Sequence, residues 1–394
     1  MRVVVVGAGI IGSCTALAAA RAGLDVVVLD RGQVGSGTTS RGEGNVLVSD
    51  KHPGPELDLA LLSRRRWADL GAELGTDALE LEAKGGLVVA TDPGALHPLA
   101  ALAAAQRAAG VVAERSTAPQ DREPFLSPDV AGAYWYPQDA QVQPVLAAAA
   151  VLAAAQRQGA AYRPFTEVVA ADRTDTGRLR GVVTSTGDRV GADAVVNCAG
   201  TWGAVVGERL GAAVPVLPRK GFVLVTEPLP PTVHSKVYSA DYVANVAAST
   251  EGLETSCVVE GTRGGTVLIG ASRERVGFDT SMSPRTVARL AAQAVRLFPV
   301  LAGVRLLRVY RGFRPYCPDH LPVIGPDPRD TAVLHACGHE GAGIGLAPAT
   351  ADLIAAHLTG TDVATAIGLD PAPYLPDRLV RPGEGTGAGT QEAW

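Results

Sequence analysis

Residues 3–30 read VVVVGAGIIGSCTALAAARAGLDVVVLD, and this stretch decides the fold. Four consecutive valines open it, as expected for a buried parallel strand. Apolar residues then recur at helical spacing up to Ala22, and Gly23 stands where a helix C-cap belongs. A second apolar run ends at Asp30. The pattern predicts a strand, a helix and a second strand, which form the opening βαβ unit of a parallel sheet.

Three glycines with GxGxxG spacing, Gly7, Gly9 and Gly12, lie between the first strand and the helix. The spacing alone is weak in a chain with 46 glycines among 394 residues, so its position in the βαβ unit carries the signal. Gly7 permits a tight turn, Gly9 lets the backbone approach a pyrophosphate, and Gly12 lets helix and strand pack closely. The helix start at Ile10 and Ile11 would offer amides and a positive dipole end to phosphates.

Asp30 ends the second strand and would accept hydrogen bonds from the hydroxyls of an adenosine ribose. Arg31 follows it and is expected at the same site. Next comes a loop rich in Gly, Ser and Thr, residues 35–45, which offers hydroxyl and backbone donors. The contacts expected in this loop are Gly37, Thr38, Thr39, Ser40, Gly44 and Asn45.

A second glycine-rich turn, residues 338–345, precedes the last long helical stretch. Its amides and the helix dipole would stabilise negative charge on a reduced flavin. A nicotinamide-binding domain would not need this distant turn, whereas the two-ended cofactor FAD would. A tight packing corner is the alternative. The contacts expected in the turn are Gly341, Ala342, Gly343, Ile344 and Gly345.

The remaining pattern places a strand-rich middle between the two ends of a nucleotide-binding domain. Helices are expected at residues 96–109, 143–158, 284–297 and 344–358. Strands are expected at residues 85–90, 165–170, 181–185, 194–197, 221–226, 266–270 and 332–336.

Bulk composition excludes several classes of protein. The net charge of -5 and the lack of a basic block argue against a nucleic-acid partner. The five cysteines show no CxxC pair and no zinc-ligand spacing, so we expect reduced, mostly buried thiols, no metal site and a cytoplasmic location. The first strand starts at Arg2, which leaves no room for a signal peptide, and charged residues interrupt every apolar stretch too early for a transmembrane helix.

The chain resembles the D-amino-acid-oxidase-like FAD oxidoreductases, which include glycine oxidase, sarcosine oxidase, D-amino-acid dehydrogenase, hydrogen cyanide synthase and the β subunits of opine and D-hydroxyproline dehydrogenases. The resemblance extends to about Tyr374. Its last turn and residues 262–273 look closest to the cyanide synthase and opine or hydroxyproline dehydrogenase branch. Besides GAGIIG and Asp30, the landmarks are GSGTTS (35–40), WYPQDAQVQP (135–144), VVNCAGTWG (195–203), a PRKG turn (218–221), GFRPYCPDHLPVIG (312–325) and GHEGAGIGLAPAT (338–350).

The resemblance implies an α/β fold, in which a Rossmann-like FAD-binding domain is interleaved with an α+β substrate domain built on a large antiparallel sheet. We expect the FAD-binding domain to comprise residues 1–84, 141–214 and 319–375. The substrate domain would comprise residues 85–140 and 215–318. Residues 376–394 would form a flexible tail.

The same resemblance implies roles for single residues. Arg314, the arginine of GFRP, would bind the substrate carboxylate, since a guanidinium group matches a carboxylate bidentately. Without the resemblance, a surface salt bridge is the preferred interpretation of Arg314. The VVNCAGTWG segment would lie beside the pyrophosphate through Ala199, Gly200 and Trp202, and Val168 would lie near the adenine.

Further candidates carry open alternatives. Tyr238 and Tyr242 would line the substrate pocket, or they are ordinary sheet tyrosines. His339 would lie near the flavin, or it is a structural turn histidine. Gly312 occupies the position at which monomeric sarcosine oxidases carry a cysteine for covalent flavin, so we expect non-covalent FAD. Gly341 replaces an arginine of some glycine-oxidase-like proteins, which puts a second substrate clamp in doubt.

The expected activity is FAD-dependent oxidation of the C–N bond of a small amino acid or secondary amine by hydride transfer to flavin N5, which gives an imine. The enzyme would be an oxidase or a dehydrogenase, and oxygen or another acceptor would take the electrons. One alternative is the flavin dehydrogenase subunit of an opine, D-hydroxyproline or cyanide-forming complex with small redox partner subunits. Another is a tailoring amine oxidase for a larger substrate. A nicotinamide-dependent dehydrogenase and a non-catalytic FAD-binding protein are rivals from other classes.

Overall fold

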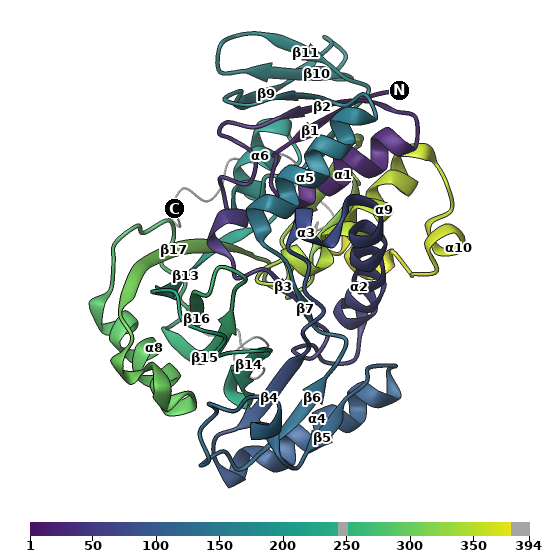
Figure 1. The fold of residues 1–394 in the computed structure, drawn as a ribbon. Coiled ribbons are helices and arrows are strands. Elements are labelled where there is room, and N and C mark those ends of the chain that lie inside the picture. Colours follow the sequence, from purple (N-terminus) through teal and green to yellow (C-terminus); the bar gives the residue numbers. More distant parts are fainter. Residues whose placement is uncertain (243–250, 380–394) are drawn as a thin grey trace.

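Two large sheets organise residues 1–242 and 251–379, the residues that the computed structural model describes (Figure 1). The first has the strand order β18-β19-β12-β1-β2-β8. All its neighbouring strands are parallel except the antiparallel pair β18 and β19. Its strands are β1 (Arg2–Val6), β2 (Asp25–Leu29), β8 (Ala161–Arg163), β12 (Ala194–Asn197), β18 (Val323–Asp327) and β19 (Asp330–Cys337).

Alternation along β1 explains how this sheet is covered on both faces. Val3 and Val5 belong to the core that faces the helices, whereas Val4 and Val6 belong to the core on the opposite face. This is the two-residue period of a strand with two buried faces. The helices are α1 (Ile10–Arg21), α2 (Pro55–Leu74), α5 (Pro144–Arg157) and α9 (Gly343–Thr359), and the other face is covered by β9 (Val168–Arg173), β10 (Leu179–Thr184), β11 (Arg189–Gly191) and α6 (Gly203–Leu210) (Figure 1).

The second sheet has the strand order β17-β13-β16-β15-β14-β4-β6-β5. It is antiparallel, as predicted, except that β14 and β4 pair in parallel. Helix α8 (Pro284–Leu297) packs on β13, β15 and β16, and α4 (Leu96–Ala108) packs on β6. The strands are β4 (Gly86–Ala90), β5 (Glu114–Ser116), β6 (Gly132–Tyr136), β13 (Leu217–Thr226), β14 (Lys236–Ser239), β15 (Glu254–Gly261), β16 (Val267–Arg273) and β17 (Leu306–Tyr316).

Short elements complete the described part of the chain. Strands β3 (Asn45–Val46) and β7 (Ala140–Gln141) pair between the two large sheets (Figure 1). Two short helices are α3 (Thr76–Leu79) and α10 (Val363–Ile367). The 3-10 helices are η1 (Thr39–Arg41), η2 (Pro93–Ala95), η3 (Pro119–Asp121), η4 (Gly200–Trp202), η5 (Pro299–Gly303), η6 (Ala372–Tyr374) and η7 (Pro376–Leu379).

The structure confirms the predicted fold class and corrects two local expectations. The strand predicted at residues 165–170 begins later, at Val168, because Phe165 adopts a positive φ of 52° in a turn. The predicted PRKG turn is the start of β13, where Pro218 lies opposite Pro315 of β17. Along the chain, groups of strands belong alternately to the first and the second sheet, which is the order that an interleaved fold requires. The domain boundaries stay predictions.

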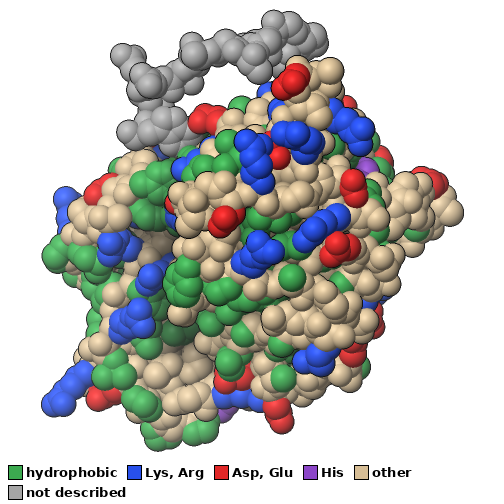
Figure 2. Space-filling view, turned by 90° about the horizontal axis from the view of Figure 1, so that it is seen from above, with side chains coloured by type: hydrophobic (Ala, Val, Ile, Leu, Met, Phe, Trp, Pro, Cys, Tyr) green, Lys and Arg blue, Asp and Glu red, His purple; other side chains and the backbone are tan. Residues whose placement is uncertain are grey.

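Several bulk features are also visible. All five cysteines are buried and free, as predicted. On the face seen in Figure 2, basic and acidic side chains are interspersed. Among the described residues, no helix has both the length and the apolar character needed to cross a bilayer. Of the predicted tail, residues 376–379 form η7, in which Arg378 pairs with Asp319 at 2.7 Å, and residues 380–394 lie outside the described residues.

Candidate cofactor and substrate site

A cavity of about 440 Å³ lies where the carboxyl end of the parallel sheet meets β13 and β17 of the second sheet. The opening βαβ unit, the loop of residues 31–45, the segment after β12 and the turn before α9 all contribute to its wall. The predicted cofactor residues that line it are Gly7, Gly9, Ile10, Ile11, Asp30, Arg31, Gly37, Thr38, Thr39, Gly44, Asn45, Val168, Ala199, Gly200, Trp202, Gly341, Gly343 and Ile344.

Four predicted cofactor residues do not line this cavity. Gly12 lets α1 approach the strand turn, since a Cβ there would lie 1.8 Å from the Gly7 carbonyl oxygen. The Ser40 hydroxyl donates to the carbonyls of residues 36 and 37 within its own loop. Ala342 lines a second cavity, and the Gly345 carbonyl accepts a hydrogen bond from the Trp67 indole. These four residues therefore lie outside the lining of the cavity.

The turn between β1 and α1 leaves room for an anionic group. Gly7 has a φ of +113°, and a Cβ there would lie 2.5 Å from the Cys198 carbonyl oxygen, so glycine is required. Helix α1 starts beside the cavity, Gly9 has no side chain to cap it, and the Ile10 amide donates to the Thr39 hydroxyl at 3.1 Å. Exposed amides at a helix N-terminus, with the positive end of the helix dipole, suit a pyrophosphate.

Asp30 is held in place by the backbone around it. One carboxylate oxygen accepts from the Ala8 amide at 2.7 Å, and the other accepts from the Gly32 amide at 2.7 Å. A carboxylate oxygen has two acceptor sites, so each oxygen can still accept a hydrogen bond from a hydroxyl group in the cavity. The geometry fits the predicted ribose contact.

The Arg31 guanidinium lies over the Trp202 ring, 4.0 Å from its centroid, and both residues line the cavity. The Thr201 hydroxyl donates to the carbonyl of Phe313 in β17 at 2.6 Å, and the Thr38 hydroxyl lies 2.9 Å from the Thr201 hydroxyl and 3.1 Å from the same carbonyl. These contacts join the loop after β2, the segment after β12 and the second sheet at one wall of the cavity.

Sequence reasoning missed Glu43, which lines the same cavity and is 6% exposed. Its Oε1 atom has no hydrogen-bond partner among the described residues. A buried acceptor without a donor is costly, and an N–H or O–H group of a bound cofactor or substrate would satisfy it. The only sequence signal was its place between Gly42 and Gly44 in the predicted binding loop.

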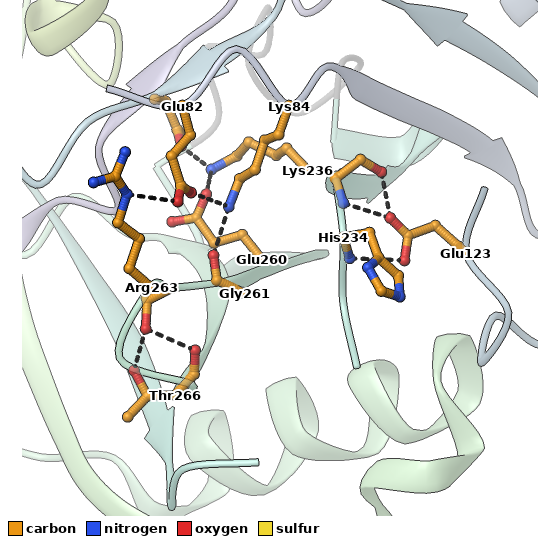
Figure 3. A network of polar contacts seen from close by, with 12 residues as sticks. Glu82, Lys84, Glu123, His234, Lys236, Glu260, Gly261, Arg263 and Thr266 are labelled. Atoms are coloured by element: carbon orange, nitrogen blue, oxygen red, sulfur yellow. Dashed lines mark hydrogen bonds and ion pairs between the residues drawn. The ribbon is translucent and has the colours of Figure 1, made fainter. Parts of the chain in front are cut away.

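Lys236 and Glu260 form a buried ion pair (Figure 3). The Lys236 ammonium group contacts the Glu260 carboxylate and the Asn45 side-chain oxygen. Lys84 extends this network by donating to the Gly261 carbonyl at 2.5 Å (Figure 3). The network joins β14 and β15 to the short strand β3 and thereby positions Asn45.

Arg314 lies in the cavity wall at the end of β17. Its Nη1 atom donates to the Ser272 carbonyl at 2.8 Å, and it forms no ion pair with a described carboxylate. Room for the guanidinium comes from Gly221, where a Cβ would lie 2.2 Å from Nη1. Burial, and then the charge of Arg273, lowers the pKa of Arg314. The structure therefore places at the cavity a cation that has no ion-pair partner among the described residues.

The two candidate tyrosines have different surroundings. Tyr242 lines the cavity and is 5% exposed. Tyr238 lies in β14, lines neither described cavity, and its hydroxyl bonds to the Ser49 hydroxyl in the core. The placement of Tyr238 in the pocket is thus corrected: β14 turns this side chain into the core, where Tyr242 packs against it edge-on.

His339 also lines the cavity, and its Nε2 atom lies 3.0 Å from the Thr350 hydroxyl. Burial lowers the pKa of His339 to about 3, so the ring is neutral at physiological pH. Gly312 lines the cavity against Arg41, with no space for a side chain, and Cys317 lines neither cavity. Neither position therefore offers a thiol to the cavity, and the non-covalent attachment of FAD stays a prediction.

A second cavity of about 250 Å³ adjoins the first, since Tyr242, Glu340 and Gly341 line both. Many ionisable side chains line this second cavity. They are Asp50, Lys51, His52, Glu56, Arg273, Asp319, His320 and Glu340. Sequence reasoning did not connect these residues.

A dinucleotide-binding sheet joined to a second sheet over a shared cavity defines a class of two-domain nucleotide-dependent enzymes. The family model described as FAD dependent oxidoreductase matches residues 2–357. The chain belongs to this FAD-dependent oxidoreductase family, and FAD is its cofactor.

Individual relatives agree with this assignment. Glycine oxidase of Pseudomonas putida is 31% identical over 385 residues, which cover 95% of this chain and 98% of that protein. Hydrogen cyanide synthase subunit HcnC of Pseudomonas aeruginosa is 33% identical over 258 residues, which span 65% of this chain and 57% of that subunit. The crystal structure of glycine oxidase from Geobacillus kaustophilus superimposes with a TM-score of 0.85 at 28% identity, covering 96% of this chain and 100% of that chain.

Proposed function

We propose that this protein oxidises the C–N bond of a small amino acid or secondary amine to an imine, with Arg314 binding the substrate carboxylate. One observation carries the proposal: the Arg314 guanidinium lines the cofactor cavity without a carboxylate partner among the described residues. Similarity to glycine oxidases over nearly the whole chain supports the reaction class.

In this reaction the substrate loses a hydride from the carbon beside nitrogen, and the nitrogen lone pair forms the second bond of an iminium group. Release of the N–H proton to water then gives the imine. FAD, when bound, supplies the two-electron acceptor. Gly7, Gly9 and Asp30 would hold its nucleotide half, and the turn at Gly341 and Gly343 would hold the opposite end. The residues of this chain contribute mainly by orienting the substrate, because the reacting atoms must be held close and aligned.

Arg314 is suited to this orienting role. A hydrogen bond to the Ser272 carbonyl holds the guanidinium, which packs closely over Gly221. The Arg314 side chain therefore loses little conformational freedom when a substrate binds. A carboxylate would pair with it inside a buried wall, where charge-assisted hydrogen bonds are strong. An amine that binds deprotonated needs no side-chain base.

The test is the visible spectrum of the purified holoenzyme, mixed without oxygen with glycine, sarcosine, D-proline derivatives and other small amino acids. We expect at least one of them to bleach the flavin band. In Arg314→Gln, bleaching should require at least about tenfold more substrate, since charge-assisted hydrogen bonds are lost. The FAD content should stay unchanged.

The matched control is Arg308→Gln. Arg308 is another arginine of β17, its guanidinium carbon lies 5.7 Å from the centroid of the Tyr310 ring, and it lines neither cavity. It should behave as the wild type. If no amine bleaches the flavin, the proposed reaction is wrong, and if Arg314→Gln behaves as Arg308→Gln does, the role of Arg314 is wrong.

The similarity to a hydrogen cyanide synthase subunit supports a second candidate, a flavin dehydrogenase subunit that passes electrons to partner subunits. The two candidates differ in how the reduced enzyme is reoxidised. An oxidase recovers its flavin band within seconds of admitting air, whereas a dehydrogenase subunit recovers it faster with an artificial dye than with air.

A further inference from the structure

Arg273, at the end of β16, is a buried cation that the proposed reaction does not use. Its side chain lines the second cavity, and the residue is 3% exposed. The guanidinium carbon lies 4.7 Å from the centroid of the Tyr242 ring. No hydrogen bond or ion pair joins this guanidinium to another residue that the structure describes.

The carboxylates around this cavity are mostly engaged elsewhere. Glu340 contacts Arg219 and lies 3.4 Å from the His320 ring nitrogen Nδ1. Asp50 pairs with Lys51 at 2.7 Å, and Asp319 pairs with Arg378 at 2.7 Å. Burial raises the pKa of the remaining acid, Glu56, to about 7, so it is only partly ionised near neutral pH. None of these acids forms an ion pair with Arg273.

Arg273 ends β16 and Arg314 lies near the end of β17, two strands that flank β13, and the two side chains line adjoining cavities. Arg314 donates to the carbonyl of Ser272, the residue directly before Arg273. Tyr242, Glu340 and Gly341 line both cavities and therefore lie where the two adjoin. Arg314 lies beside this boundary, since a Cβ on Gly341 would be 3.5 Å from the Arg314 Nε atom.

The buried Arg273 and the partly buried Arg314 form no ion pair with a described carboxylate, and a bound anion would stabilise both guanidinium groups. We propose that Arg273 binds a second anionic group of the substrate, so that the substrate is an amine with two carboxylates, one on Arg314 and one on Arg273. This inference rests on the proposed function, because it assigns Arg314 to the first carboxylate. An N-(carboxyalkyl) amino acid has the required chemistry.

The direct test measures binding to the oxidised holoenzyme with unreactive probes, by perturbation of the flavin spectrum and by calorimetry. Glutarate carries two carboxylates, and butyrate is a chain of similar length with one. We expect glutarate to bind at least about tenfold more tightly to the wild type. Arg273→Gln should remove this preference and leave butyrate affinity unchanged, whereas Arg314→Gln should weaken both probes.

A matched substrate pair tests the same point kinetically. Iminodiacetate differs from sarcosine by one carboxylate that replaces a hydrogen of the N-methyl group, and longer N-(carboxyalkyl)glycines vary the spacing. The best dicarboxylate should exceed sarcosine in kcat/KM by at least about tenfold, and Arg273→Gln should erase this advantage. Arg308→Gln should keep it.

Two results would overturn the inference: equal binding of glutarate and butyrate to the wild type, or an equal loss of both in Arg273→Gln. The second result would mean that Arg273 only holds the Tyr242 ring in place and does not bind the substrate. Failure of the proposed function is distinguishable, because it leaves the flavin unbleached by every amine while the unreactive probes still report on Arg273.

Discussion

Burial in the fold changes the acid–base properties of single side chains in this protein. His339 is 3% exposed, and burial lowers the pKa of its ring from the ordinary 6.5 to about 3. Between these pH values the unfolded chain binds more protons at this position than the folded chain does. The free energy of unfolding must therefore fall as pH is lowered through this range.

We predict that His339→Gln reduces the acid sensitivity of the fold. Urea unfolding of wild type and variant between pH 7 and pH 4 should show the wild type losing more stability than the variant, since only the wild type must exclude that proton. His97→Gln, which changes an exposed histidine of α4, should follow the wild type. Parallel curves for wild type and His339→Gln would contradict the assigned burial effect.

Site residues could be predicted from the sequence where their position follows from residues close to them in the chain. Asp30 follows from its place at the end of a strand after a glycine motif, and it lines the cavity. Arg273 could not be predicted in this way, because its position depends on the pairing of β16 with β13 and of β13 with β17. Tyr238 and Tyr242 are four residues apart, and only the folded sheet distinguishes the one that reaches the cavity.

At the scale of elements, local signals decided which predictions succeeded. Helix α8 has the predicted bounds, 284–297, because Pro284 stands at its start and Leu290, Ala294 and Leu297 repeat on its buried face. The start of β13 was mistaken for a turn because proline cannot donate to a sheet ladder. Pairing along the whole of β17 keeps Pro218 in the strand.

Ser283 caps α8, and its hydroxyl oxygen accepts from the Thr286 amide at 3.3 Å. We predict that Ser283→Ala lowers the free energy of unfolding by about 1 kcal/mol, as loss of an N-cap does elsewhere. Urea unfolding of the holoenzyme measures this change, and FAD content should not change. Ser185→Ala alters an exposed serine outside any helix and serves as control. An unfolding midpoint equal to the control would refute the capping role.

At the scale of the whole molecule, the cofactor cavity joins the two sheets. Its wall includes Gly9 and Asp30 from the first sheet region and Val223 and Phe313 from the second. A ligand that contacts both regions in the folded chain and neither in the unfolded chain must stabilise the fold by mass action. The overall architecture was predictable, whereas the packing of the second cavity depends on side chains far apart in sequence.

We predict that removal of FAD lowers the melting temperature and that added FAD restores it. At a free FAD concentration of 100 times Kd, the expected gain is about 2.7 kcal/mol. Thermal unfolding followed by circular dichroism over a series of FAD concentrations measures the effect, with riboflavin as a control that lacks the nucleotide half. If saturating FAD left the melting temperature unchanged, this would contradict the binding of FAD in a cavity that both sheets share.

The order of the strands in the first sheet has a consequence for biosynthesis. Strand β1 leaves the ribosome first, yet its neighbour β12 begins at residue 194, and β19 begins at residue 330. The far wall of the cavity, at residues 339–344, is made later still. The glycine motif at residues 7–12 therefore waits until residues 339–344 have been made, and FAD can be fully enclosed only after that point in synthesis.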